Sequence, residues 1–130
     1  MCLNATIKTD EGIITMQQPD PTTVMLHDLL ANMASEERKK YPVKTGVIDY
    51  FRDALFRMAR VSYEGNQKHN PGEPLHWARG KSDDHGDCCA RHLFCNDEEQ
   101  EAAEAAWRAC AHLQLLLEKK YHIAPPPGVK

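Results

Sequence analysis

The stretch from residue 66 to residue 93, NQKHNPGEPLHWARGKSDDHGDCCARHL, divides the chain into helical segments. Its first part contains two prolines and two glycines, which interrupt helices, so residues 66–80 are predicted to form a long loop. Its second part begins at Ser82, a residue type that caps helices, and Asp83 and Asp84 suit the positive end of a helix dipole. The stretch therefore predicts a loop followed by a short helix that ends near residue 96.

The sequence on both sides of this stretch has the periodicity of amphipathic helices. We expect helices over residues 22–40, which end before the Tyr41-Pro42 pair, and over residues 45–64, with Gly65 as the residue after the helix. A last helix is expected over residues 97–121. Its apolar face is predicted to hold Ala102, Ala105, Ala106, Ala109, Leu113, Leu116 and Leu117.

These elements predict an all-α fold, a four-helix bundle with a long functional loop between the second and third helices. We expect an N-terminal arm over residues 1–20, a helical domain over residues 21–122 and a C-terminal tail over residues 123–130. Residues 13–16 are expected to form either a short strand or an arm that packs on a neighbour, and no pattern predicts a sheet.

Charge and cysteine content exclude several classes of protein. The net charge of −3 argues against a protein that coats a nucleic acid polymer, which would carry a basic excess. The five cysteines are an odd number, two of them are adjacent, and no secretory signal opens the chain, so free thiols in a reducing cytoplasm are expected. No apolar run approaches the roughly 20 residues that span a bilayer, so no membrane partner is expected.

Carboxylates on the third and fourth predicted helices suggest a metal site. Asp84, Asp87 and Arg91 fall within about 60° of one another on a helix. Glu98 projects along the apolar face of the last helix, with Glu101 at the edge of that face, and inward carboxylates are costly unless paired or bound to a metal. Two such pairs on antiparallel helices would form a site for Mg²⁺ or Mn²⁺.

Two further points on these carboxylates stay open. Asp53, on the second helix, is the first choice to complete the metal site. Alternatively, the acids of the third and fourth helices are ordinary first-turn residues that favour the helix dipole, and Asp53 belongs to a solvated face with neighbouring arginines.

The loop carries the side chains expected to bind a substrate. Trp77 offers a flat apolar surface beside Arg79 and Lys81, whose charges suit phosphate oxygens. His69 and Asn70 have donors and acceptors that can read the edge of a base. Alternatively, Trp77 belongs to the core, and Arg79 and Lys81 lie on a solvent-exposed basic turn. The predicted substrate-binding residues are Asn66, Lys68, His69, Asn70, His76, Trp77, Arg79 and Lys81.

Histidines and cysteines recur along the third helix, at positions 85, 88, 92 and 95. A single helix of that length spans about 15 Å, so the four side chains cannot close around one zinc ion. Cys88 and Cys95 are therefore expected to be core thiols. His85 and His92 are expected either to orient the acids or to be buried with backbone partners.

Seven short segments together resemble the phage dATP/dGTP diphosphohydrolases, which are small MazG-like all-α nucleotide pyrophosphohydrolases. The segments are FRDAL at 51–55, ARVS at 59–62, GN at 65–66, HNPGEPLHWARGKS at 69–82, DH at 84–85, RHL at 91–93 and AWRA at 106–109. The resemblance covers roughly residues 42–119, and the run at 69–82 is its most specific part.

This resemblance implies an enzyme that cleaves dGTP, and in some members dATP or GTP, to the monophosphate and pyrophosphate. It implies Mg²⁺ or Mn²⁺ held by helix carboxylates, a homo-oligomer (dimer or tetramer) in the host cytoplasm, and a supply of dGMP for phage 2,6-diaminopurine deoxynucleotide synthesis. The family carries ExxE and ExxD motifs on consecutive helices, and the pairs Asp84/Asp87 and Glu98/Glu101 are the nearest candidates here. Asp84, Glu98 and Arg91 are the expected catalytic residues.

Two other interpretations remain open at this stage. An HD-type phosphohydrolase would use His85 and His92 with Asp84 and Asp87, although no second His-Asp pair supports it. A non-catalytic helical interaction module would leave the loop composition and the inward Glu98 unexplained.

Overall fold

The computed structural model describes residues 5–9, 12–16, 33–95 and 97–125, with side chains described from residue 33 onward. Within this part of the chain the structure is predominantly helical, as predicted. An antiparallel hairpin is present in addition. Its strands are β1 (Ala5–Thr9) and β2 (Gly12–Met16), in a register that pairs Ala5 with Met16 and Thr9 with Gly12. The strand interpretation of residues 13–16 is thus confirmed, whereas the expectation of no sheet missed the partner strand.

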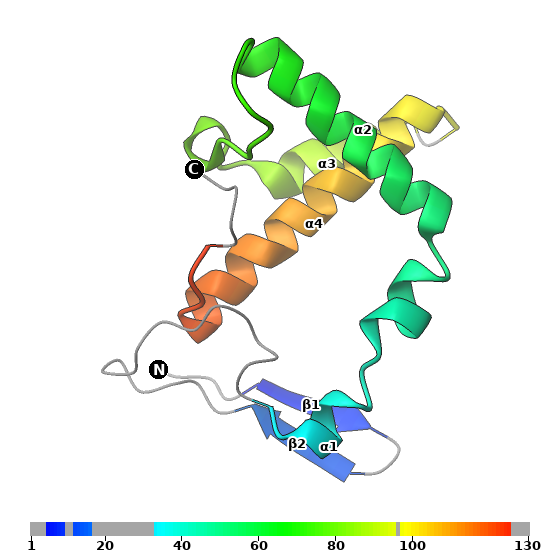
Figure 1. Cartoon of the computed structure of the whole chain (residues 1–130), viewed down its shortest axis with the longest axis vertical. Helices are drawn as coiled ribbons and strands as arrows, with labels where there is room; N and C mark the ends of the chain where they lie inside the picture. The colour runs from blue at the N-terminus through cyan, green and yellow to red at the C-terminus, as the bar shows by residue number, and fades with distance from the viewer. Residues whose placement is uncertain (1–4, 10–11, 17–32, 96, 126–130) are drawn as a thin grey trace.

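The predicted first helix lies mostly outside the described residues, since only residues 33–40 of its range are described. Within them α1 is short, running from Ser35 to Arg38, and residues 39 and 40 form a turn instead of continuing the helix. The hairpin and α1 lie together at the lower end of the molecule in Figure 1.

The predicted second helix is wrong at both ends. It is interrupted at residues 49–51, which separate a π-helical turn, η2 (Lys44–Ile48), from α2 (Arg52–His69). The helix then continues through Gly65 and ends at His69, with Asn70 as the C-cap residue directly before Pro71. A single glycine costs a helix only about 1 kcal/mol, whereas the residue before a proline is driven out of the α region. The proline therefore determines where α2 ends.

The third and fourth helices are present close to their predicted ranges. α3 runs from His85 to Leu93, and α4 from Glu99 to Tyr121. Asp84 occupies the N-cap position of α3 in place of the predicted Ser82, which lies in extended backbone two residues earlier. His122 ends α4 in the left-handed conformation, with φ of 53°.

α4 is the central helix of the described fold. α3 packs along its N-terminal half, and α2 crosses it (Figure 1). Arg57 of α2 donates to Glu99 at 2.7 Å and also to Gln100, and Trp107 Nε1 donates to Ser62 Oγ at 2.7 Å. Three helices thus pack together within the described residues, and the predicted fourth partner lies mostly outside them.

The predicted apolar face of α4 is wrong at several positions. Ala105 is buried as expected, together with Ala103, Ala111 and Tyr121, which the prediction did not include. Ala102, Ala109, Leu113 and Leu116 are exposed. The alanine-rich sequence leaves the apolar direction ambiguous, and α4 is contacted from two sides by α3 and α2. Small side chains consequently lie where the helices approach most closely, and the larger leucines lie elsewhere.

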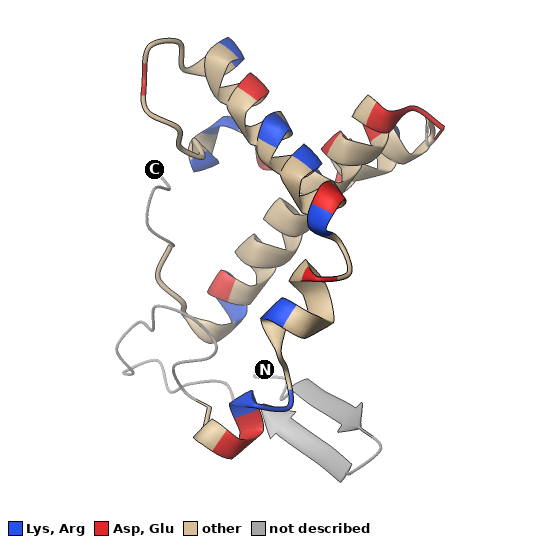
Figure 2. Ribbon diagram, turned by 45° about the vertical axis from the view of Figure 1, so that its right-hand side comes forward, with Lys and Arg blue, Asp and Glu red and all other residues tan. Residues whose placement is uncertain are grey.

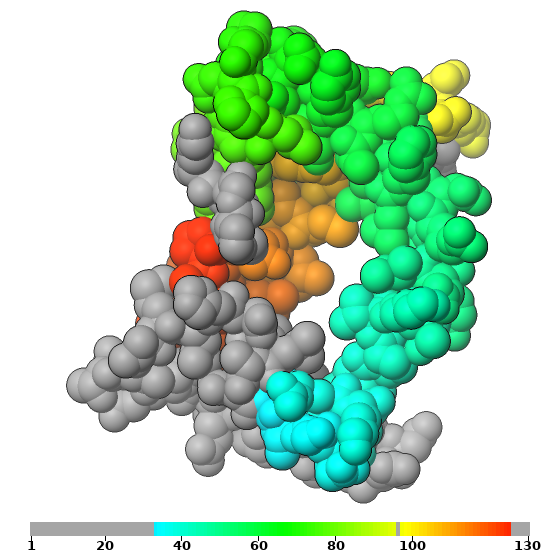
Figure 3. Space-filling view, in the orientation of Figure 1, coloured from blue at the N-terminus to red at the C-terminus, as the bar shows by residue number. Residues whose placement is uncertain are grey.

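The large apolar side chains around the predicted second helix are also largely uncovered. Phe51 and Phe56 are 54% and 72% exposed, and Val47 and Ile48 are each 44% exposed. Figure 3 shows an opening between the η2 end of this segment and α4. Basic and acidic residues are interspersed along α2 on the side that Figure 2 presents. The described core is therefore concentrated around α3 and α4.

Enlarging Ala105 should test this corrected face of α4. Ala105→Leu forces a larger side chain against α3, where Cys89 Sγ lies 3.3 Å from the carbonyl oxygen of Ala105. We expect a loss of about 1–3 kcal/mol in the free energy of unfolding, measured by urea denaturation. Ala102→Leu, on the exposed side of the same helix, is the matched control and should change stability by less than about 0.5 kcal/mol. Equal losses in both variants would contradict this packing.

Candidate functional site

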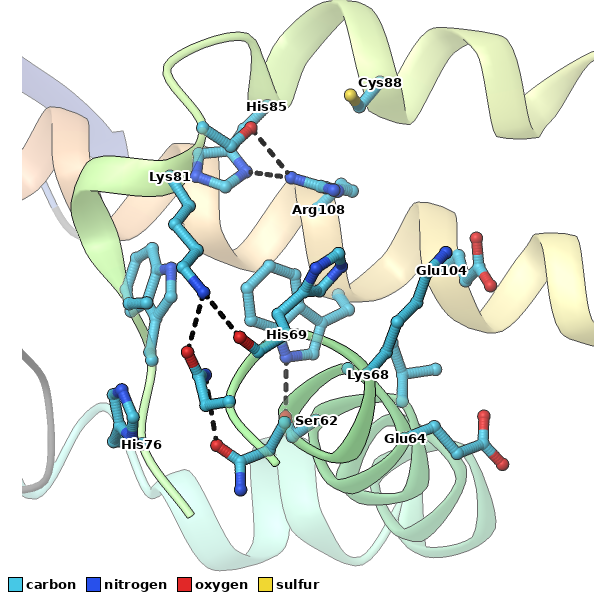
Figure 4. Close-up of a pocket in the computed structure, with 18 of the residues that line it drawn as sticks. Ser62, Glu64, Lys68, His69, His76, Lys81, His85, Cys88, Glu104 and Arg108 are labelled. Atoms are coloured by element: carbon cyan, nitrogen blue, oxygen red, sulfur yellow. Dashed lines mark hydrogen bonds between the residues drawn. The ribbon is translucent and has the colours of Figure 1, made fainter. Parts of the chain in front are cut away.

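A cleft of about 910 Å³ lies between the end of α2, the following loop, the start of α3 and the middle of α4 (Figure 4). Its volume is within the usual range for small-molecule sites. It is lined by seven of the eight predicted substrate-binding residues, with Arg79 as the exception. Seven of the eight residues thus share one cleft, and their role in binding a substrate stays a prediction.

Three rings form the aromatic end of the cleft. Trp77 from the loop and Trp107 from α4 meet edge to face, with ring centroids 5.7 Å apart. His85, the first residue of α3, contacts both, at 5.9 Å from Trp77 and 6.0 Å from Trp107. The bond from Trp107 to Ser62 fixes one indole on two helices. These rings are inclined to one another at 58° to 79°, and together they give this end of the cleft an aromatic lining.

His85 is buried beside a cation. It is only 2% exposed, and Arg108 lies 3.0 Å from its Nδ1. Burial, and next the charge of Arg108, hold the pKa of His85 below its ordinary value. Arg108 also donates to Ser82 Oγ at 3.0 Å, so the arginine is held at the start of α3. His85 Nε2 is covered and has no hydrogen-bond partner among the described residues.

Hydrogen bonds between polar side chains connect the two ends of the loop. Lys81 donates to the carbonyl oxygen of His69 at 2.8 Å and to Asn70 Oδ1 at 2.7 Å. Asn70 Nδ2 donates to Asn66 Oδ1 at 3.2 Å, and the buried Asn66 donates to the carbonyl oxygen of Glu73 at 3.1 Å. Asn66, Asn70 and Lys81 thus shape the wall of the cleft through bonds to one another.

Arg79 is not placed as predicted. Its guanidinium forms a largely buried ion pair with Glu118 near the end of α4, with one N–H donating to Glu118 Oε1 at 3.2 Å. It also lies over the Trp77 ring, 4.6 Å from the centroid. The side chain is therefore committed to holding the loop and its tryptophan against α4, and it does not line the cleft.

The opposite end of the cleft carries charged side chains. Glu64, Lys68 and Glu104 lie there, on α2 and α4, away from His76 and Lys81 (Figure 4). Glu104 is a member of a second group of side chains. His92 Nδ1 lies 2.6 Å from Glu101 Oε2, and His92 Nε2 lies 3.2 Å from Glu104 Oε2.

The geometry of His92, Glu101 and Glu104 is compatible with a metal ion. Their candidate ligand atoms all lie within 4.8 Å of one another, and they come from two packed helices. One imidazole and two carboxylates form a mixed nitrogen and oxygen donor set. Of the predicted metal ligands, only Glu101 belongs to this group. Through Glu104 the group borders the cleft.

The other predicted acids do not gather around Glu101. Asp84 is at the opposite end of α3 from His92, about 12 Å away along the helix. Asp53, Asp87 and Glu98 are exposed, and Glu98 is at the N-cap of α4 in extended backbone, not directed into the core. The two predicted acidic pairs therefore do not face each other. The reason is that the first residues of α4 extend past the end of α3.

Asp84 has a structural role in the described geometry. It accepts hydrogen bonds from Ser82 Oγ at 2.8 Å, from Cys88 Sγ at 3.4 Å and from Arg91 at 3.4 Å. These donors lower the pKa of Asp84 to about 2, with Ser82 as the largest cause. The expected proximity of Asp84 and Arg91 is confirmed, and Arg91 also donates to Cys88 Sγ at 2.7 Å. Neither Asp87 nor Arg91 lines the cleft.

The predictions for the cysteines, that they are free and that Cys88 and Cys95 are buried, are confirmed only in part. Cys88, Cys89, Cys95 and Cys110 are free, as predicted, and Cys2 lies outside the described residues. Cys88 is buried, but Cys95 is exposed because it follows the end of α3. His85 and His92 are held by different partners, Arg108 and the two glutamates, so neither the zinc nor the HD arrangement is assembled.

Three residues that define the site were not predicted: His92 as a potential ligand, Glu104 and Arg108. A signal for the last two was present, because Glu104, Trp107 and Arg108 are three and four residues apart and share one face of a helix. Arg108 and Trp107 also lie in one of the segments that carry the family resemblance. The partner of His92 depends on how α3 and α4 pack, which the periodicity does not specify.

Comparison of the chain with models of protein families, with curated proteins and with solved structures finds no match. Among the described helices, none combines the length and the apolar character needed to cross a membrane.

We expect an NMR titration to give Asp84 a pKa of about 2, below its ordinary value of 3.8. Because the pKa is lower in the folded state, the stabilisation is complete above about pH 4 and is lost as the pH falls toward 2. Ser82→Ala removes the largest cause and should raise this pKa. Ser35→Ala, in α1, is the control and should leave it unchanged. A wild-type pKa near 4 for Asp84 would contradict the described hydrogen bonds to its carboxylate.

Proposed function

We propose that this chain is a metal-dependent nucleotide diphosphohydrolase that cleaves dGTP, with dATP and GTP as further candidate substrates, to the monophosphate and pyrophosphate. The observation that carries the proposal is the composition of one cleft. It has an aromatic wall at one end and a cationic and carboxylate-rich end at the other, where Glu104 also belongs to a candidate metal-binding group.

The two ends suit the two parts of a nucleotide. Trp77 and Trp107 offer faces on which a base can stack, an interaction worth about 1–3 kcal/mol per base. Lys68 lies at the charged end and His69 also lines the cleft, so their side chains are available to phosphate oxygens. The substrate would consequently lie with its base toward the loop and its phosphates toward Glu64 and Glu104.

His92, Glu101 and Glu104 are the residues that would hold the metal ion. Their mixed donor set suits Mn²⁺ better than Mg²⁺, because imidazole is a softer ligand than oxygen. A divalent ion held there would supply neutralisation of phosphate charge and a bound water of lowered pKa. Of the originally expected ligands, Asp53, Asp84, Asp87 and Glu98 are not part of this proposal.

Hydrolysis requires a proton acceptor and charge stabilisation around the reacting phosphate. Water attacks the α-phosphorus, the bond to the bridging oxygen breaks, and pyrophosphate leaves with the electron pair. Glu64, which lines the charged end of the cleft, is the proposed acceptor of the proton from water. Lys68 would stabilise the negative charge on the departing pyrophosphate.

The family resemblance extends the proposal to the cellular role. On this basis the protein would be a homo-oligomer of the host cytoplasm that provides dGMP for 2,6-diaminopurine deoxynucleotide synthesis in phage. The separate environments of His85 and His92 give no support to the HD-type alternative.

The proposal is tested by incubating the protein with dGTP and Mn²⁺ or Mg²⁺ and resolving the products. We expect dGMP and pyrophosphate. Glu104→Gln should lower the turnover number by at least about 100-fold, because the substitution removes a carboxylate from both the cleft and the metal-binding group. Glu36→Gln, which neutralises an exposed carboxylate on α1, should leave turnover unchanged. Circular dichroism should show equal helix content in both variants.

Other products would indicate other functions. Release of intact triphosphate would indicate the HD-type reaction. Absence of turnover of any nucleotide would argue for the non-catalytic interaction module and against the proposed enzyme.

A further inference from the structure

We infer that Glu101 positions the His92 ring, so that His92 Nε2 and Glu104 are the two protein ligands of the metal ion. The inference rests on the proposed function, because it concerns the ion at the same cleft, and it narrows the metal-holding group from three ligands to two. Glu101 then contacts the imidazole and not the ion, which makes it a positioning residue.

The two glutamates contact different nitrogens of the same ring. His92 lies in the last turn of α3, and Glu101 and Glu104 lie three residues apart on α4. Glu101 Oε2 is 2.6 Å from His92 Nδ1, whereas Glu104 Oε2 is 3.2 Å from His92 Nε2. The two ring nitrogens point in different directions, so one ion cannot bind to both. An ion bound to one nitrogen therefore lies beside the glutamate that contacts that nitrogen.

The shorter contact indicates which nitrogen keeps a hydrogen. An ionised carboxylate has acceptors but no donor, so the 2.6 Å hydrogen bond to Glu101 requires the hydrogen to be on Nδ1. A neutral imidazole carries a single hydrogen, which leaves Nε2 with the electron pair that can bind a metal. Histidines that ligate metals commonly donate their other N–H to a carboxylate, which fixes the orientation of the ring. Glu101 has the position of such a carboxylate.

The position of the cleft favours the same nitrogen independently. Glu104 lines the cleft, whereas Glu101 does not. An ion beside Nε2 and Glu104 therefore lies at the border of the cleft, within reach of the phosphates of the proposed substrate. An ion beside Nδ1 and Glu101 would lie away from the side chains that line the cleft.

Glu104 is itself held by a neighbouring side chain. Gln100 Nε2 donates to Glu104 Oε1 at 2.6 Å, and Gln100 in turn accepts a hydrogen bond from Arg57. The other carboxylate oxygen, Oε2, faces His92. Each of the two ligands thus has its own orienting partner. Two protein ligands leave further positions on the ion for water or phosphate oxygens, as is usual for divalent ions at phosphate sites.

The first test identifies the metal-bound nitrogen in the full-length wild-type protein. Long-range proton–nitrogen NMR spectra distinguish the two ring nitrogens of a histidine. Zn²⁺ is the probe, because it is diamagnetic and accepts imidazole and carboxylate ligands. We expect His92 Nδ1 to keep its hydrogen and Nε2 to take the chemical shift of a metal-bound nitrogen. Metal binding through Nδ1 would overturn the inference, and this result does not depend on the folding of any variant.

The second test compares two variants of α4 that remove the same charge. Glu104→Gln and Glu101→Gln each neutralise one carboxylate of the group, so they form a matched pair. Dissociation constants for Mn²⁺ alone are measured by electron paramagnetic resonance. Loss of an orienting partner costs about 10–100-fold in metal affinity, and we expect this loss in Glu101→Ala, which removes the acceptor. Glu101→Gln should lose less than about tenfold because its amide oxygen still accepts from Nδ1, whereas Glu104→Gln should lose at least about 100-fold.

The outcomes separate this inference from the proposed function. Equal losses in Glu101→Gln and Glu104→Gln would identify Glu101 as a ligand and overturn the inference. Hydrolysis of dGTP by a protein in which Zn²⁺ leaves both His92 nitrogens unchanged would overturn it as well, while the enzyme itself stands. Metal binding through Nε2 by a protein that turns over no nucleotide would support the inference and overturn the proposed enzyme.

Discussion

The position of Arg108 determines much of the described structure. From the middle of α4 its guanidinium donates to Ser82 and to His85, and its carbon Cζ lies 5.7 Å from the centre of the Trp107 ring. Ser82 in turn donates to Asp84, the N-cap residue of α3. One side chain therefore connects the start of α3 to α4 and places His85 against the two tryptophans. The aromatic end of the cleft exists because this partly buried charge has two acceptors at fixed positions.

The sequence predicted the helical elements better than it predicted their boundaries. Periodicity located α2 and α4, and the polar residues at the start of α3 located that helix. α3 and α4 bury a face against each other, whereas α2 leaves Phe56 and Tyr63 exposed. Periodicity gave no warning of the break before Arg52, because residues 45–51 continue an apolar pattern without proline or a turn signal. At the other end of α2 two local signals competed, and Pro71 outweighed Gly65 because proline excludes the helical conformation from its neighbour, whereas glycine only weakens it.

The site was predicted where it depends on local sequence and missed where it depends on packing. His76, Trp77 and Lys81 line the cleft because a single loop carries them. Arg79 was assigned to phosphate because nothing near it in the sequence reveals Glu118, its ion-pair partner 39 residues later. The metal assignment needed the correct rotation of α4 about its axis. An alanine-rich helix leaves that rotation ambiguous. The prediction therefore directs Glu98 into the bundle and does not include Glu104 among the metal ligands.

The contrast between the two ends of the cleft follows from the same electrostatics. Burial disfavours the charged form of His85, and the positive charge of Arg108 disfavours it further, so the pKa of His85 is lowered. The aromatic end therefore combines one cation, Arg108, with a histidine whose uncharged form is favoured. At the other end Glu64 and Glu104 face Lys68 and a potential cation, an arrangement that needs compensating charge to be stable. If the proposed function holds, one nucleotide would place its uncharged base at the first end and its anionic phosphate oxygens at the second.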